Sequence, residues 1–356
     1  MKIGLIGLPN SGKTTVFNAL TGLEAEVTAY AAAKAEPNLA IVDVMDARVT
    51  RLAEMYNPKK TIYATLECVD MPGMVEGAAK EGIFSDADLG LIKTMDALAL
   101  VVRNFKDAAD EEPQPLKDLQ QLEDELLLSD LILAENRVER IAASIRRGQK
   151  TNELVREEKV LSRICAQLND DKPLRTLEFN SDEDKAMRGF QFLTRKPLLV
   201  VLNSDESNFG RNSDLLQTIS TKHEAIEFAG GFEMELTRLE DPEEVSMFLA
   251  DMGIETSAKD RLTQSAYEVL GYISFFTVGE DEVRAWNIRN GQPAVEAAGV
   301  IHSDLARGFI RAACFSYDDL MTHGTEKEIR DKGLLRLEGK DYQVQDGDIL
   351  NIRFNV

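Results

Sequence analysis

The feature that most constrains this chain is a glycine-rich loop near its amino terminus. Residues 7–14 read Gly-Leu-Pro-Asn-Ser-Gly-Lys-Thr and match GxxxxGK[ST], between the apolar run Lys2–Gly7 and the helix-like segment Thr15–Leu20. Such a loop turns successive backbone N–H groups toward a phosphate, at the positive end of the helix that follows. A chance glycine loop is the alternative, and it would leave the flanking strand and helix unexplained. The sequence therefore predicts an α/β fold that binds a nucleoside triphosphate.

Each residue type in this phosphate loop has a chemical task. Lys13 is expected to bridge the β- and γ-phosphates, and the Thr14 hydroxyl is expected to ligate Mg²⁺. Backbone N–H groups supply the remaining phosphate contacts. Asn10 is also a candidate ligand for a monovalent cation such as K⁺, with a plain loop role as its alternative. The predicted nucleotide-binding residues of the loop are Asn10, Ser11, Gly12, Lys13, Thr14 and Thr15.

A second anchor ends the next apolar run, Leu66–Met71. The tetrapeptide that begins at Asp70 reads Asp-Met-Pro-Gly, a DxxG element in which the aspartate holds Mg²⁺ through water and the glycine N–H senses the γ-phosphate. DxxG alone is common, and its position after a strand gives it weight here. The residues expected to carry the phosphate chemistry are Lys13, Thr14, Asp70 and Gly73, with Mg²⁺ on Thr14 and Asp70.

Base recognition is expected after a later apolar run, Pro197–Asn203. Guanine-specific proteins use NKxD at this point, whereas residues 203–206 read Asn-Ser-Asp-Glu, so the lysine is absent and the acid is one methylene longer. Guanine-reading geometry is therefore not assured, and adenine becomes a candidate base. A loop carboxylate pair without a ligand is the alternative. We expect Asn203, Glu206 and Gly230 to bind the nucleotide.

The chain of 356 residues is long enough for two or three domains. Short apolar runs that suit buried parallel strands are Lys2–Gly7, Leu66–Met71, Leu98–Arg103 and Pro197–Asn203, with a weaker one at Ala225–Ala229. Between the third and fourth runs, apolar residues at helical spacing and a break at 148–151 predict an inserted antiparallel helical hairpin. The predicted domains are a nucleotide-binding domain (1–110 and 191–272), the hairpin (111–190) and a β-rich C-terminal domain (273–356).

The charge balance narrows the possible partners. Lys and Arg number 41 against 62 Asp and Glu, a net charge of −21 that argues against a nucleic-acid coat over the whole surface. Residues 136–164, however, hold eight basic against four acidic residues, a local excess of +4. This segment is either a solvated helical face with i,i+4 ion pairs or a contact for a polyanion such as RNA. The candidate contact residues are Arg140, Arg146, Arg147 and Lys150.

The cysteines argue against a zinc or redox centre. Cys68, Cys165 and Cys314 lie far apart, without a CxxC pair or a Cys/His cluster. We expect buried free thiols in a reducing cytoplasm. No stretch approaches the roughly 20 apolar residues that a membrane span needs, and the chain is expected to carry no targeting segment.

Taken together, these motifs resemble the YchF (Obg-like ATPase) family of P-loop proteins over essentially the whole chain. Matching segments in the first 206 residues are Gly7–Asn10, Gly12–Lys13, Phe17–Thr21, Glu36–Asn38, Gly77–Ala78 and the NxxE at Asn203 and Glu206. Segments that resemble the family's TGS domain are Phe276–Thr277, Val283–Trp286, Ala297–Gly299, Ile301–His302, Arg307–Arg311, Glu338–Tyr342 and Asp346–Asp348.

The resemblance implies a P-loop NTPase domain with a mostly parallel sheet, an inserted helical hairpin and a C-terminal α+β TGS domain of ubiquitin-like fold. It also implies a preference for ATP over GTP, Mg²⁺ as the metal, slow hydrolysis to ADP and phosphate, and association with the ribosome. The hairpin tip and the TGS domain are the expected points of contact. A membrane partner or a specific DNA partner is not expected.

Three departures from the pattern leave the degree of hydrolysis open. Lys34 stands where the family has a threonine that completes Mg²⁺ coordination, and Met74 stands where many GTPases place a water-orienting glutamine. In the family, a histidine on the following strand is the candidate substitute for that glutamine, and Leu100 stands at its position here. Two alternatives therefore stand beside a slow ATPase: a nucleotide-gated binding protein with negligible hydrolysis, and a GTPase. The three histidines, at 223, 302 and 323, are expected to be structural or exposed.

Overall fold

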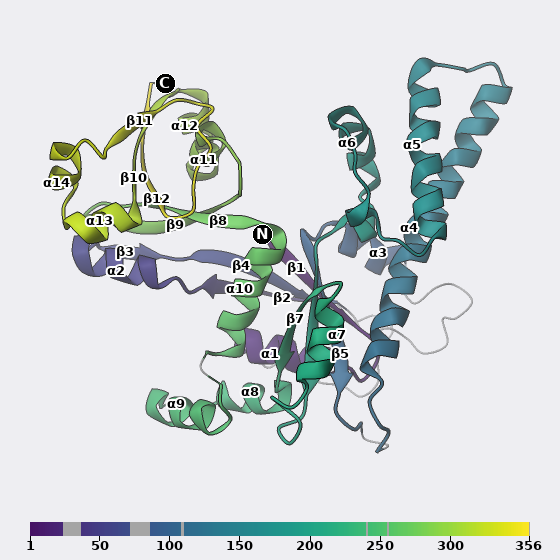
Figure 1. The fold of residues 1–356 in the computed structure, drawn as a ribbon, viewed down its shortest axis with the longest axis horizontal. Helices are drawn as coiled ribbons and strands as arrows, with labels where there is room; N and C mark the ends of the chain where they lie inside the picture. Colours follow the sequence, from purple (N-terminus) through teal and green to yellow (C-terminus); the bar gives the residue numbers. More distant parts are fainter. Residues whose placement is uncertain (24–36, 72–85, 108–109, 240, 255, 356) are drawn as a thin grey trace. The chain divides into compact units, whose positions relative to one another are not determined.

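The computed structural model describes residues 1–23, 37–71, 86–107, 110–239, 241–254 and 256–355 (Figure 1). They form two compact units: Met1–Ala40 with Glu67–Arg261, and Ile41–Leu66 with Leu262–Val356. The chain passes between the units within β2 (Asn38–Val44), β4 (Ala64–Asp70) and α10 (Ala258–Leu270). The sequence analysis did not anticipate that residues 41–66 would group with the C-terminal residues.

A six-stranded sheet in the order β2-β4-β1-β5-β6-β7 organises the first unit. Its remaining strands are β1 (Lys2–Gly7), β5 (Ala97–Asn104), β6 (Leu198–Ser204) and β7 (Glu224–Phe228). Parallel pairs join β1 to β4 and β5, and β6 to β5 and β7. All five expected apolar strands are confirmed to within two residues at each end. Strand β2 was missed because its continuous apolar run, Leu39–Val42, is short, and its buried and exposed residues alternate.

This parallel arrangement decides where the loops lie. The carboxyl ends of β1, β4, β5 and β6 are at one edge of the sheet, so the segments that follow these strands share that edge. Ligands of α/β proteins bind at this edge. The phosphate loop, Asp70 and the residues after Asn203 are therefore brought to the same side of the first unit.

The helices of the first unit cover and extend the sheet. They are α1 (Lys13–Thr21), α3 (Asp86–Lys93), α4 (Pro115–Arg146), α5 (Asn152–Asn169), α6 (Ser181–Met187), α7 (Ser213–Ser220), α8 (Gly230–Leu236) and α9 (Pro242–Asp251). Short 3₁₀ turns lie at Leu174–Thr176, Arg188–Phe190 and Leu193–Arg195. No helix among the described segments is both long enough and apolar enough to cross a membrane.

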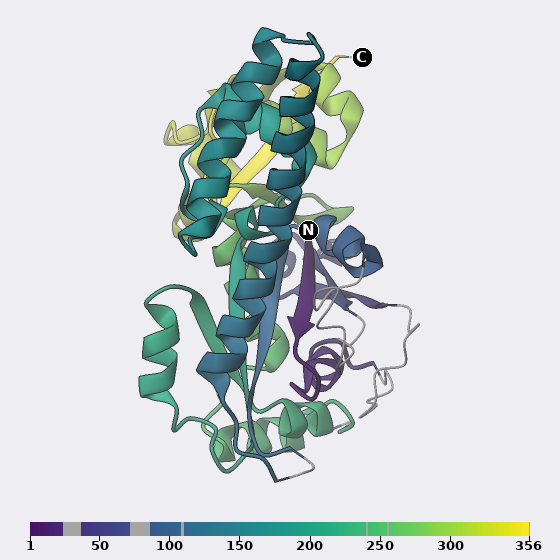
Figure 2. The same cartoon turned by 90° about the vertical axis from the view of Figure 1, so that its right-hand side faces the viewer.

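The two halves of helix α4 pack into two different hydrophobic cores. Leu119, Leu122 and Leu126 of its first half pack with Leu100 and other sheet residues, and burying each leucine contributes roughly 1.5–3 kcal/mol. Its second half packs against α5, where the buried residues include Ala134, Ile141, Leu161 and Ile164. Figure 2 shows the two helices side by side beyond the sheet. The predicted antiparallel hairpin is confirmed.

The second unit is a separate α+β structure. Its sheet has the order β11-β10-β12-β8-β9-β3. The strands are β3 (Lys60–Ile62), β8 (Tyr272–Thr277), β9 (Glu282–Arg289), β10 (Phe309–Ser316), β11 (Arg336–Glu338) and β12 (Asp348–Phe354). The helices are α2 (Ala47–Tyr56), α11 (Ala294–Ile301), α12 (Ser303–Arg307), α13 (Tyr317–His323) and α14 (Glu326–Asp331).

Residues 41–66 are tied to the C-terminal residues by specific contacts. Strand β3 pairs in parallel with β9. The Arg48 guanidinium on α2 donates to Asp346 at 2.6 Å and lies over the Phe276 ring, 5.0 Å from its centroid. The second unit is thus built from two distant parts of the chain.

Candidate nucleotide-binding site

Two glycines of the phosphate loop are required by close packing. A Cβ on Gly7 would stand 2.4 Å from Ser11 Oγ, and a Cβ on Gly12 would stand 2.2 Å from Asn203 Nδ2. Gly12 also has φ of +76°, in the left-handed region that favours glycine. Asn10, at φ of +63°, uses the same region, which asparagine tolerates better than most residues. The loop therefore has little freedom to accept larger side chains.

The residues predicted for phosphate chemistry converge at the start of α1. The Lys13 ammonium contacts the Asp70 carboxylate and the Met71 carbonyl oxygen. Thr14 Oγ1 donates to Asp70 Oδ2 at 2.9 Å, and Asn38 Nδ2 donates to the same oxygen at 3.3 Å. Lys13 and Asp70 are only 8% and 3% exposed. Three of the four residues thus form one cluster, in which Lys13 and Asp70 are buried and Thr14 is half-buried, and the fourth, Gly73, lies outside the described residues.

The donors in this cluster suit Mg²⁺ and phosphate. A hydroxyl and a carboxylate are the hard oxygen ligands that Mg²⁺ takes from protein, so Thr14 and Asp70 would hold the ion. Among the described residues, no side chain caps the first turn of α1, so the N–H groups of that turn remain available to an anion. The Ser11 amide is different, because it donates to the Leu8 carbonyl at 3.1 Å. The Ser11 hydroxyl is buried without a hydrogen-bond partner among the described residues.

Asn203 joins three parts of the site. Its Nδ2 donates to the Ser11 carbonyl at 3.0 Å, and its Oδ1 accepts from the Gly230 amide at 3.1 Å. A Cβ on Gly230 would stand 2.5 Å from that oxygen. Asn203 therefore braces the phosphate loop against the start of α8. Glu206, three residues further on, is exposed.

Comparison with known proteins decides the family. The chain is 38% identical to the ribosome-binding ATPase YchF of Bacillus subtilis (strain 168), with 99% of each chain covered. It is 35% identical to the ribosome-binding ATPase YchF of Escherichia coli O157:H7, covering 100% of this chain and 99% of that one. This chain belongs to the YchF family.

Family models and a solved structure agree with this assignment. Residues 2–137 match MMR_HSR1, described as a 50S ribosome-binding GTPase, and residues 272–355 match YchF-GTPase_C, described as a protein of unknown function. The structure of the Schizosaccharomyces pombe YchF GTPase superposes with a TM-score of 0.84 at 30% identity, covering 99% of this chain and 97% of that one. The α/β fold with a P-loop NTPase domain is thereby established for this YchF family member.

Of the histidines of this YchF family member, only His223 shares the first unit with the phosphate cluster, and it lies away from that cluster. His223 stands just before β7, at the opposite edge of the parallel sheet from the phosphate loop, and its Nε2 is 3.1 Å from Glu123 Oε1. His302 and His323 belong to the second unit. Leu100 is fully buried in β5, within the core of the first unit. Lys34 and Met74 lie outside the described residues.

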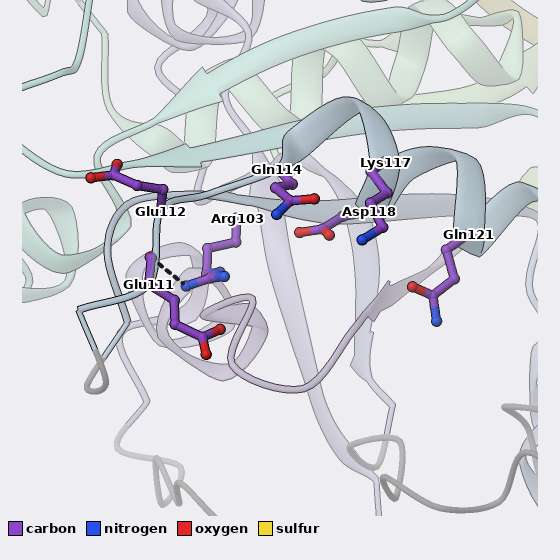
Figure 3. Close-up of a pocket in the computed structure, with 7 residues that line it drawn as sticks. All are labelled: Arg103, Glu111, Glu112, Gln114, Lys117, Asp118 and Gln121. Atoms are coloured by element: carbon purple, nitrogen blue, oxygen red, sulfur yellow. Dashed lines mark hydrogen bonds between the residues drawn. The ribbon is translucent and has the colours of Figure 1, made fainter.

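A polar pocket lies where β5 ends and α4 begins (Figure 3). The Arg103 guanidinium donates to the Glu111 carbonyl at 3.3 Å across its wall. Burial raises the pKa of Asp118, although Arg103 and Lys117 oppose that shift. The remaining lining residues are Glu112, Gln114 and Gln121. None of the predicted nucleotide-binding residues lines this pocket, so it is distinct from the phosphate cluster.

Sequence reasoning missed some supporting residues of the site. Asn38 contacts Asp70 from β2, and the strand itself was not anticipated. Asn104 on β5 donates to Ser204, the last residue of β6, and Glu227 on β7 accepts from Ser204 and from Gly210 in the segment that follows. Such contacts join residues that are distant in sequence, and no local sequence motif indicates them. The short apolar run Leu39–Val42, directly after Asn38, is the signal that would have pointed to this strand.

Proposed function

We propose that this chain is an ATP-binding P-loop NTPase that hydrolyses ATP slowly to ADP and phosphate and acts as a ribosome-associated, nucleotide-dependent regulator. Its YchF relatives are named ribosome-binding ATPases. The observation that carries the proposal is the cluster of Thr14 with the buried Lys13 and Asp70 at the amino end of α1. The site of this activity would be the cytoplasm, where ribosomes work.

The cluster suggests how the phosphates are held. Lys13 supplies positive charge to the β- and γ-phosphates, and nucleotide binding exchanges its contacts with Asp70 and Met71 for phosphate oxygens. Thr14 and Asp70 hold Mg²⁺, which supplies further charge neutralisation. Backbone N–H groups of α1 complete the phosphate contacts, and Gly73 is proposed to sense the γ-phosphate. Asn10 is retained as a candidate K⁺ ligand. The chemistry is therefore positioning and electrostatic stabilisation.

Slow turnover follows from the surroundings of the cluster. Among the described residues of the first unit, no histidine lies at the carboxyl edge of β1, β4 and β5, and Leu100 is a core residue that cannot orient water. An uncoordinated attacking water raises the barrier to hydrolysis, because such enzymes depend on a positioned nucleophile. This same observation favours the second candidate function, a nucleotide-gated binding protein with negligible hydrolysis.

The base is proposed to be read by the segment 205–212, here named the base loop. It follows Asn203, which already braces the phosphate loop, and it carries the exposed Glu206. Glu206 accepts hydrogen bonds only, so it suits the exocyclic amine of adenine. A GTPase is the remaining candidate, since one solved relative is named a YchF GTPase.

The ribosome contact is proposed at the tip of the helical hairpin. Arg137 and Arg163 already form ion pairs with Glu157 and Glu183, each with a nitrogen–oxygen distance of 2.7 Å. The four tip residues are exposed and have no ion pair within the described segments: Arg140, Arg146, Arg147 and Lys150. Unpaired cations on an acidic protein favour a polyanion over a purely solvated face. The C-terminal domain, proposed to be a TGS domain, is the second contact.

Calorimetry and a phosphate-release assay together test the proposal. Wild-type protein with Mg²⁺ should bind ATP more tightly than GTP and release phosphate slowly, and ribosomes should not abolish release. Lys13→Ala should weaken ATP binding by at least tenfold, because the main cation at the phosphates is lost. The exposed Lys185 on α6 provides a matched control, and Lys185→Ala should behave as wild type.

The outcomes separate the three functions. If the protein binds ATP but releases no phosphate, with or without ribosomes, it is a nucleotide-gated binding protein and not an ATPase. A strong preference for GTP would establish the GTPase and contradict the role given to Glu206. Rapid phosphate release without any partner would contradict slow intrinsic turnover.

A further inference from the structure

One carboxylate, that of Glu227, gathers three hydrogen bonds near the end of β7. Its Oε1 accepts from Ser204 Oγ at 2.5 Å and from Asn212 Nδ2 at 2.6 Å. Its Oε2 accepts from the Gly210 backbone N–H at 3.2 Å. Ser204 precedes the base loop, while Gly210 and Asn212 belong to it. A side chain from the neighbouring strand therefore holds the base loop at both ends.

Further bonds make this segment a preformed structure. Asn104 Nδ2 on β5 donates to Ser204 Oγ at 2.9 Å, which links a third strand to the network. Within the loop, Asn212 Nδ2 donates to the Asn208 carbonyl at 2.7 Å, and the Asp205 carboxylate accepts from the Asn208 amide at 2.9 Å. The polar groups of the loop thus bond to one another and to the sheet.

Glu206 takes part in none of these bonds. It is exposed, while its neighbours are held on either side. The phosphate loop is braced by other contacts, from Asn203 to Ser11 and to Gly230. The base loop and the phosphate loop therefore depend on different side chains.

We propose that Glu227 is a positioning residue for base recognition, which fixes the base loop so that Glu206 meets the purine of the nucleotide. The inference rests on the proposed ATP-binding function. Glu227 acts through Ser204, Gly210 and Asn212. A loop that is ordered before binding loses less conformational freedom when the ligand arrives, so fixing it increases affinity. This increase in affinity comes from contacts with the base and not from contacts with the phosphates.

The test compares a ligand with a base and a ligand without one. Glu227→Ala should raise the Kd and the KM for MgATP about tenfold, which corresponds to roughly 1.4 kcal/mol. The kcat should stay within about twofold of wild type, since the residues at the phosphates are untouched. Binding of Mg-tripolyphosphate, which has no base, should also stay within about twofold. A general structural defect would weaken both ligands.

Three further variants sharpen the test. Glu227→Gln keeps one oxygen acceptor and should recover most of the ATP affinity. Glu224→Ala, an exposed change at the other end of β7, should match wild type. If thermal melting shows that Glu227→Ala is unfolded, Asn212→Ala removes the loop's side of the contact and should give the same pattern.

Two results would overturn the inference while leaving ATP binding intact. One is an unchanged ATP affinity in folded Glu227→Ala. The other is an equal loss of ATP and tripolyphosphate binding, which would make the role of Glu227 structural. Wild-type protein that fails to bind MgATP would instead overturn the proposed function itself.

Discussion

Asn203 supports the predicted site through hydrogen bonds to two of its other segments. From its place in NxxE it was expected among the nucleotide-binding residues, and in the structure its amide is engaged by Ser11 and Gly230. A Cβ on Gly12 would stand 2.2 Å from the Asn203 amide nitrogen, so the position of the Asn203 side chain requires glycine at residue 12. That Asn203 also binds the nucleotide stays a prediction.

The thiols allow a residue-scale prediction about pH. Burial raises the pKa of Cys68 and of Cys314 to about 12, and both side chains are fully buried. A thiol with a pKa of 12 is about one part in 10⁴ thiolate at pH 8, and only the thiolate reacts with iodoacetamide. Cys165 is partly exposed, and burial raises its pKa less far.

Cys165 should therefore be alkylated first in the native protein. Its labelling rate should rise as pH increases from 7 to 9, because a higher pH increases its thiolate fraction. Mass spectrometry of native protein, with a urea-unfolded sample as control, measures the order. Labelling of Cys68 or Cys314 as fast as that of Cys165 in the native protein would contradict the burial of those thiols.

At the scale of elements, the hairpin is fastened to the first unit by a buried carboxylate. Asp130 on α4 accepts from the Leu193 amide at 2.8 Å, the Thr194 amide at 2.8 Å and the Thr194 hydroxyl at 2.7 Å. Burial raises the pKa of Asp130, and these bonds from Thr194 and Leu193 oppose that shift. The turn at Leu193–Arg195 thus connects α4 to the chain that enters β6.

Asp130→Ala should lower the free energy of unfolding by about 2–4 kcal/mol, because two buried amides lose their acceptor. Urea denaturation followed by circular dichroism measures the change. Asp124 on the same helix is exposed and accepts only from Gln120, so Asp124→Ala should change stability by less than about 0.5 kcal/mol. Equal effects of the two substitutions would show that the turn at Leu193–Arg195 does not depend on Asp130.

The same scale shows what the sequence could predict. Continuous apolar runs identify buried strands, so β1, β4, β5 and β6 were found, whereas β7, in which only Phe228 is buried, was indicated more weakly. Strand β3 has three residues, and its pairing with β9 joins positions more than two hundred residues apart, so no local pattern indicates it. The phosphate loop carries its function in consecutive residues. The hold of Glu227 on the base loop exists only after the strands have assembled.

At the scale of the whole molecule, charge is distributed unevenly. The net charge of −21 opposes approach to RNA over most of the surface, while the hairpin tip concentrates cations that the acidic residues nearby do not pair. Helix α4 runs for 32 residues, so it holds the tip well beyond the part that packs on the sheet. An acidic protein with a basic tip should therefore meet an RNA-rich partner by that tip.

Reversing the tip charges tests this expectation. Substituting Arg140, Arg146, Arg147 and Lys150 by Glu should weaken co-sedimentation with ribosomes and flatten its salt dependence, by up to about one unit of log–log slope for each lost phosphate contact. The matched control reverses four exposed cations of the first unit outside the tip and the nucleotide site: Lys117, Lys185, Lys222 and Arg238. Both variants change the net charge equally, so a general electrostatic effect would weaken both. If the tip variant binds like wild type over the whole salt range, the tip is a solvated face and the contact lies elsewhere.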